Sequence, residues 1–158
     1  MSQCDLFKVS EDIYSIQKSK FNDTLNLKAL SLYRKQSEWF TKLNYSCKKD
    51  TIFILEFPGI QGNYNFTFWN NTDTISYTNE SGTFELMNKT LFTKYMMKLV
   101  SEWNIKEIKK EESINSNLLP SEKIYATKII FLNKKYNMDS ICFKDFFDFE
   151  RDEMNINE

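Results

Sequence analysis

The chain has 158 residues, which predicts one domain spanning 1–158, and its fourteen Phe, eight Tyr and three Trp residues supply ample core material. It contains no His, the usual general base near neutral pH and the commonest metal ligand, so we expect no enzyme, no cofactor and no metal site. Basic and acidic residues nearly balance at 21 and 22, and Arg occurs only at Arg34 and Arg151, which argues against nucleic-acid binding.

The first helical pattern covers residues 11–44. Ser10, followed by Glu11 and Asp12, is an acceptable helix start because acidic side chains are favoured in the first turn. We expect one long helix or two consecutive helices broken near 22–23, with residues 1–9 frayed. The apolar stripe expected to face the core consists of Leu25, Ala29, Leu32, Trp39, Phe40 and Leu43.

From residue 51 the apolar period changes from about 3.6 to about 2 residues. Four short runs predict strands, at 51–57, 63–69, 74–78 and 83–87. The links between them are PGIQG, NNTD and NESG, all made of turn-favouring residues. Links this short predict a four-stranded antiparallel meander.

The turns also predict which residues face each other across the strands. If NNTD closes the second hairpin, Phe66 faces Tyr77 and Phe68 faces Ile75. This register gathers the large side chains on one face, which we expect to pack against helices at 90–104 and within 25–44. The other expected pairs are Tyr77 with Phe84, Ile75 with Leu86, Phe57 with Tyr64, Leu55 with Phe66, and Phe53 with Phe68.

The C-terminal half predicts a helix and a hairpin. Residues 90–103 return to helical spacing, 123–132 (KIYATKIIFL) predict a fifth strand, and 136–146 contain a sixth. The turn lies at 133–134 or at a later centre, and residues 150–158 are expected to be frayed. The fold class is therefore α+β: an N-terminal helix or helix pair, a four-stranded antiparallel meander, a helix and a C-terminal β-hairpin.

Three apolar residues do not fit the polar second face of the meander. Ile52, Ile54 and Trp69 fall among Asn, Thr and Ser side chains, and the expected register places Ile52 opposite Trp69. Either the N-terminal helix covers this apolar corner, or Trp69 is an exposed anchor for a protein partner.

The second candidate site is the acidic stretch KDFFDFERDE near the C-terminus. Its alternating carboxylates at Asp148, Glu150 and Asp152 could contact a partner or a hard cation. The stretch lacks the Gly and the bidentate Glu that a calcium-binding EF-hand loop requires. The ordinary alternative is a strand end that runs into a solvated acidic tail.

The cysteines and the lack of long apolar runs predict the cellular compartment of the protein. Cys4, Cys47 and Cys142 are widely spaced, and an odd count predicts free or buried thiols in a reducing compartment. No apolar run approaches the roughly 18 residues of a membrane span, so we expect no transmembrane segment and a cytoplasmic protein. The alternative is a protein of the cell envelope, lipidated at Cys4 if an upstream signal segment was removed.

These observations favour a non-catalytic module that binds another protein. In its general build, a small chain rich in Lys and Asn, with a helix, meander, helix and hairpin, is similar to many bacterial immunity proteins. That resemblance, at the level of fold, implies a protein that neutralises a toxin by binding it. The alternative function is that of a ligand-binding envelope lipoprotein. The sequence leaves the oligomeric state open.

Overall fold

The computed structural model describes residues 4–38, 42–58, 64–79, 85–86, 91–108 and 123–144. These residues confirm the α+β class. The helices are α1 (Leu6–Lys20), α2 (Thr24–Ser37) and α4 (Leu91–Glu102). The strands are β1 (Lys49–Pro58), β2 (Tyr64–Trp69), β3 (Thr74–Thr78), β4 (Glu85–Leu86), β5 (Lys123–Leu132) and β6 (Lys135–Lys144).

The six described strands form one antiparallel sheet in the order β4-β3-β2-β1-β5-β6. The predicted meander and hairpin are both present, and β5 joins them by pairing with β1 along eight residues. The turn between β5 and β6 lies at Asn133 and Lys134, whose φ angles are 52° and 67°. Two positive φ angles in a two-residue loop match the twist of the flanking strands. In this strand order β1 and β5 each have a neighbour on both sides, so both are interior strands.

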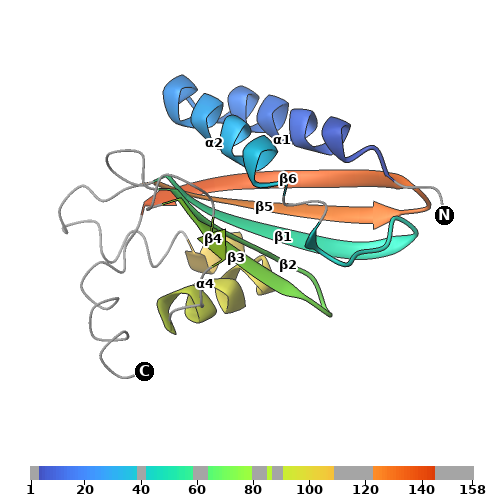
Figure 1. The fold of residues 1–158 in the computed structure, drawn as a ribbon. Helices are drawn as coiled ribbons and strands as arrows, with labels where there is room; N and C mark the ends of the chain where they lie inside the picture. The colour runs from blue at the N-terminus through green and yellow to red at the C-terminus, as the bar shows by residue number, and fades with distance from the viewer. Residues whose placement is uncertain are drawn as a thin grey trace.

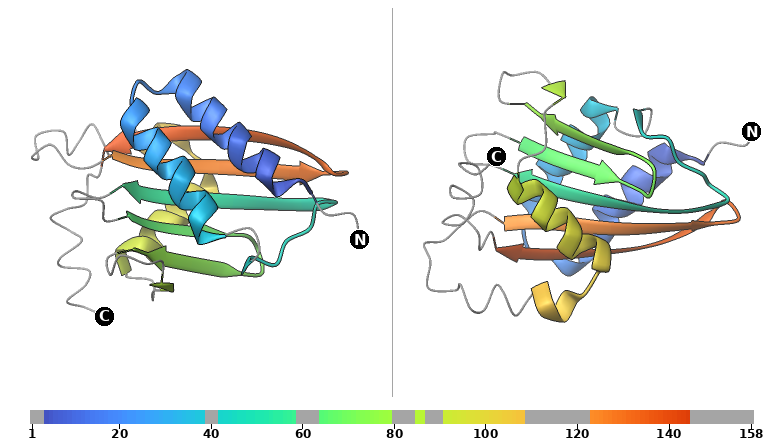
Figure 2. Two further views of the ribbon diagram at one scale, coloured as in Figure 1. Left: turned by 45° about the horizontal axis from the view of Figure 1, so that its top comes forward. Right: turned by 90° about the horizontal axis from the view of Figure 1, so that it is seen from below.

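Helices cover both faces of the sheet, which gives three layers (Figures 1 and 2). The pair α1 and α2 packs on one face, and α4 packs on the other. The expectation that helices 90–104 and 25–44 share one face was therefore wrong. Each face has its own buried apolar cluster, so the interior strands contribute side chains to two cores.

The register of β2 and β3 is the predicted one, with Phe66 opposite Tyr77 and Phe68 opposite Ile75. The register of β1 against β2 was wrong by one residue, because Phe53 lies opposite Trp69 and Ile54 lies opposite Phe68. A one-residue slip exchanges the two faces of a strand. Alternation could not determine the register here, because β1 is apolar on both faces, as interior strands covered on both sides are.

The third hairpin also differs from the prediction. Leu86 lies opposite Tyr77, whereas the expected partner of Leu86 was Ile75. Phe84, the expected partner of Tyr77, lies outside the described residues. The pairing is therefore shifted by two residues, which keeps the alternation of faces.

Helix α1 begins earlier than expected, at Leu6 instead of near Ser10. The Asp5 carboxylate accepts a hydrogen bond of 3.1 Å from the N–H of Lys8, which is an N-cap contact. The expectation of fraying was therefore wrong for residues 4–9. The predicted break near 22–23 is confirmed, because α1 ends at Lys20 and α2 begins at Thr24.

Helix α2 buries a different stripe from the predicted one. Leu25 and Leu32 are 84% and 52% exposed, whereas Leu27, Leu30 and Arg34 are fully buried. The helix also ends at Ser37, short of the predicted residue 44, and Glu38 adopts the left-handed conformation that commonly terminates helices. Trp39 and Phe40 of the expected stripe lie outside the described part of the chain.

The Asp23 side chain ties the turn between α1 and α2 to β5. Its carboxylate accepts hydrogen bonds from the Tyr125 hydroxyl at 2.5 Å and the Asn26 amide at 2.9 Å, with the Lys123 ammonium at 3.5 Å. Burial alone would raise the pKa of Asp23, but these hydrogen bonds and the charge of Lys123 lower the pKa below its usual 3.8. The folded protein therefore favours the ionised carboxylate.

Asp23→Asn is expected to reduce the free energy of unfolding at pH 7 by about 1–2 kcal/mol, because the charged acceptor is lost. Since the folded pKa lies below the unfolded value, this contribution is present above about pH 4 and is lost as the pH falls further. Urea unfolding between pH 2.5 and 7 measures the difference. Glu102→Gln, which alters an exposed carboxylate, is the control. A difference that persisted at the lowest pH would contradict the role of the charge.

Cys4 and Cys47 form a disulfide that joins the segment before α1 to the segment before β1. The remaining cysteine, Cys142, forms no disulfide and is partly buried. The expectation of free thiols was therefore wrong for Cys4 and Cys47. The bond closes a loop that contains both N-terminal helices, and it ties the N-terminal end of α1 to the start of β1.

Candidate functional site

The most concentrated buried charge lies between the helix pair and the sheet. The Arg34 side chain on α2 donates from Nε to the Glu56 carboxylate on β1 at 3.0 Å and from Nη2 to Gln17 on α1 at 2.7 Å. The Tyr64 hydroxyl on β2 donates to the same Glu56 oxygen at 2.5 Å. All four residues have no exposed surface. We call these residues, Gln17, Arg34, Glu56 and Tyr64, the buried ionic network.

This network is a structural link and offers no access for a substrate. Burial and the Glu56 carboxylate raise the pKa of Tyr64 well above its usual value, so its hydroxyl stays protonated and keeps donating. Gln17 extends the contact to Ser140 on β6 at 3.3 Å. The network thus connects both N-terminal helices to three strands, and fixes the angle at which they lie on the sheet.

On the other face of the sheet, the described residues cover only one half. Helix α4 and the short helical segment at 105–108 pack on Leu55, Ala126, Ile141 and their neighbours. The right panel of Figure 2 shows α4 over this half, with the end nearest the β5–β6 turn uncovered by described residues. The pairings place nine residues there, in three rows that we call the open face: Lys49, Leu132, Lys135; Thr51, Ile130, Asn137; and Phe53, Lys128, Asp139.

Two aliphatic side chains are exposed on the open face. Ile130 and Leu132 are 42% and 57% exposed, although they belong to the interior strand β5. A face of an interior strand is normally covered by another layer of structure. Their exposure therefore marks a surface on which the described part of the chain supplies no covering element.

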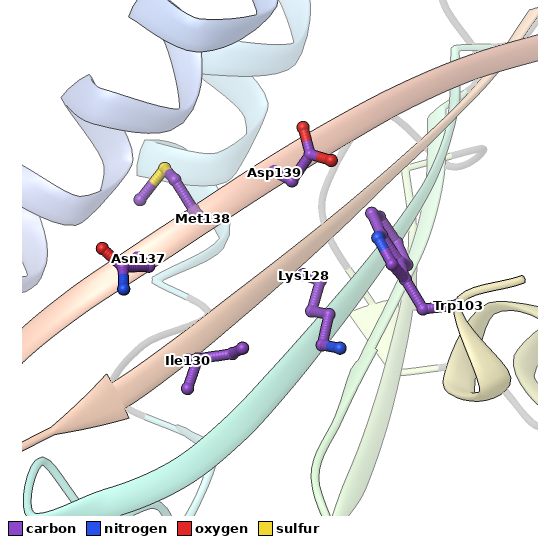
Figure 3. A pocket seen from close by; sticks show the side chains of 6 residues that line it. All are labelled: Trp103, Lys128, Ile130, Asn137, Met138 and Asp139. Carbon is purple, nitrogen blue, oxygen red and sulfur yellow. The ribbon is translucent and has the colours of Figure 1, made fainter. Parts of the chain in front are cut away.

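A groove of about 210 Å³ runs between the open face and the end of α4. Figure 3 shows its side chains: Trp103, Lys128, Ile130, Asn137, Met138 and Asp139. Trp103 follows the last residue of α4 with a φ of 49°, a left-handed conformation that costs a bulky residue about 1 kcal/mol or more. Its ring lies 6.4 Å from that of Phe53. The indole therefore forms one wall of the groove.

The open face carries more positive than negative charge. Among the described residues no carboxylate forms an ion pair with Lys49, Lys128 or Lys135, and the Lys128 ammonium lies over the Phe53 ring at 5.9 Å. The single acid, Asp139, is paired with Lys20 from the end of α1. Three lysine charges thus remain available beside the exposed aliphatic side chains.

The three residues of the predicted apolar corner do not lie together. Trp69 is 5% exposed beneath α4, where its Nε1 donates to the Ser101 hydroxyl at 2.8 Å. Ile52 and Ile54 are buried on the opposite face, beneath α1 and α2. The predicted contact between Ile52 and Trp69 was wrong, and the helix that covers Trp69 is not the N-terminal one. A partner could contact these side chains only if a helix moved.

The other predicted site residues, Asp148, Glu150 and Asp152, lie outside the described residues. One feature of the sequence does point to the open face, although it did not enter the prediction of the site. KIYATKIIFL is apolar at seven of its positions on both faces of the strand, which predicts a strand that needs cover on two sides. The sequence does not say which part of that strand is left without cover.

Comparison with protein-family models, with curated proteins and with solved structures finds no match to this chain. Within the described ranges, no group of three or more Cys, Asp or Glu side chains is placed to hold a metal ion. None of the described helices is long and apolar enough to cross a membrane. The open face is therefore the surface from which a function can be inferred.

Proposed function

We propose that the protein is a non-catalytic module that binds another protein through the open face. The observation that carries the proposal is the exposure of Ile130 and Leu132 on an interior strand, next to the Trp103 wall of the groove. Aromatic and aliphatic side chains at the centre of a surface, with charged side chains around them, are the usual make-up of a protein interface.

A small-molecule site is less well supported. Ligand pockets typically occupy roughly 300–1,000 Å³ and surround most of the ligand, whereas this groove has about 210 Å³ and lies on the surface of the sheet. The alternative of an envelope lipoprotein needs the Cys4 thiol for a lipid, and that sulfur is bonded to Cys47. The same disulfide favours an oxidising compartment over the cytoplasm.

A more specific form of this proposal is that the partner is a protein that this chain neutralises, in the manner of bacterial immunity proteins. It rests on the general build of the chain, with helices on a single antiparallel sheet and an interaction surface without catalytic groups. A toxin-like gene adjacent to the one encoding this chain would support it.

The paired variant Ile130→Glu/Leu132→Glu is expected to abolish partner binding with little change in stability, because both side chains are already exposed. The tagged chain is purified from cells that naturally express it, and the proteins recovered with it are quantified by mass spectrometry. We expect at least one protein to be recovered with the natural chain and lost with the variant.

The matched control is Leu25→Glu/Leu32→Glu, which places the same charges at exposed aliphatic positions of α2. It should recover the same partner as the natural chain. Recovery of identical proteins by all three chains would overturn the proposal that the open face binds a partner.

A further inference from the structure

We infer that the partner covers the open face with an acidic amphipathic helix, whose apolar stripe contacts Ile130 and Leu132 and whose Asp or Glu side chains pair with Lys49, Lys128 and Lys135. This inference rests on the proposed function and specifies the chemistry of its partner. It depends on two separate observations, the shape of the uncovered surface and its unbalanced charge.

The shape favours a helix. Three rows on three strands measure about 10 Å across the strands and about 14 Å along them, an area that about ten residues of helix would cover. A helix, α4, already covers the neighbouring half of the same face (Figure 2). A partner helix beside α4 would complete the layer, with Trp103 at the junction between the two.

The charge favours an acidic partner. Lys49 and Lys135 are the cross-strand neighbours of Leu132 on either side, and Lys128 lies two residues before Ile130 on β5. These ammonium groups surround the aliphatic pair, so they would form the rim of the interface. Asp139, already paired with Lys20, does not balance them. Complementary charge at a rim mainly sets the specificity and the association rate.

The same charge argues against a second copy as the occupant. In a symmetric dimer of two open faces, the lysines of one chain would lie against those of the other. Like charges brought together in an interface destabilise it. An acidic helix of another protein meets no such repulsion.

The test uses two synthetic helical peptides of roughly 18 residues. They share one Leu stripe at helical spacing and differ only in its flanking residues, which are Glu in one peptide and Lys in the other. Binding to the full chain is measured by fluorescence anisotropy at low and high salt. We expect the Glu peptide to bind about tenfold more tightly than the Lys peptide, and to weaken as salt is added.

The variant Lys49→Glu/Lys128→Glu/Lys135→Glu should reverse this preference and bind the Lys peptide more tightly. The control, Lys8→Glu/Lys18→Glu/Lys28→Glu, reverses three exposed charges on α1 and α2 and should keep the preference for the Glu peptide. Unchanged circular dichroism verifies that both variants fold. A swap of preference cannot result from a general loss of structure.

Equal affinity for the two peptides, or no binding of the Glu peptide at roughly 1 mM, would overturn the inference. So would a dimer of the natural chain that Ile130→Glu/Leu132→Glu dissociates, because a second copy would then occupy the face.

If the lysine variant still recovers the natural partner while Ile130→Glu/Leu132→Glu does not, protein binding stands and the acidic helix is wrong. If Ile130→Glu/Leu132→Glu also recovers that partner, the proposed function itself fails.

Discussion

Glu56→Ala is expected to lower the free energy of unfolding by about 3–5 kcal/mol, because it leaves a buried cation without its counter-charge. Glu56 has no exposed surface, and the side chains of Arg34 and Tyr64 both donate to it. In the variant these donors face a cavity in place of a carboxylate. Urea unfolding at pH 7, followed by circular dichroism, measures the loss.

Two comparisons separate the buried network from an ordinary ion pair. Glu11→Ala removes the partner of Lys35 at a half-exposed site and should reduce the free energy of unfolding by at most about 1 kcal/mol. Arg34→Met/Glu56→Leu removes both charges together and should be less damaging than Glu56→Ala alone, because no unpaired charge remains. A loss below about 1 kcal/mol for Glu56→Ala would show that the network contributes little to stability.

Trp69→Ala is expected to lower the free energy of unfolding by about 3–5 kcal/mol, the usual loss when a buried Trp is truncated. Its ring is stacked on Phe53 with centroids 5.5 Å apart and lies beneath α4. The substitution removes this contact and leaves the Ser101 hydroxyl without its indole donor. Chemical denaturation of the purified variant measures the change.

Leu25→Ala is the control for Trp69→Ala, because Leu25 is 84% exposed and its truncation should change stability by no more than about 0.5 kcal/mol. Ser101→Ala should cost about 1 kcal/mol, the contribution of one hydrogen bond. If Trp69→Ala left the free energy of unfolding unchanged and abolished partner binding, Trp69 would be an exposed anchor after all.

The strands and most of their order could be predicted from the sequence, and the register could be predicted only where one face is polar. In β2, Asn65 and Thr67 alternate with Tyr64, Phe66 and Phe68, so a slip against β3 would place polar side chains in the core. In β1, Ile52 and Ile54 alternate with Phe53 and Leu55, which are equally apolar. Only the long-range pairing with β5 and the two helical layers decide that strand's faces.

Burial of charge contributed to two of the errors, those in β1 and in α2. The register predicted for β1 places Glu56 on the polar face of the meander, whereas its carboxylate is fully buried, which is rare unless the carboxylate is paired. Its partner Arg34 is 22 residues away on α2, and a sequence pattern does not show such a pair. Arg34 also belongs to the buried stripe of α2. Because Arg is charged, the spacing of apolar residues does not reveal that stripe, and it favoured Leu25 and Leu32, which are exposed. The unrecognised ion pair between Arg34 and Glu56 thus contributed to the errors in both elements.

The candidate site could be located only in part from the sequence. Strand 123–132 was predicted with its true bounds, and its apolar character on both faces indicated that it needs cover on two sides. Which half of the second face stays open depends on where α4 lies and how far it reaches. That position is set by contacts between Trp69, Val100 and their neighbours in the second cluster, which are remote in sequence.

The pair of Lys20 and Asp139 also affects how the protein behaves at high concentration. It sits on β6, the last strand of the sheet, where exposed N–H and C=O groups invite a further strand. At Ser140 the N–H donates to the Asp139 carboxylate and the C=O accepts from the Lys20 ammonium. An incoming strand would have to displace both side chains to continue the ladder there. The two charges therefore protect the middle of this edge against the edge-to-edge stacking that leads to fibrils.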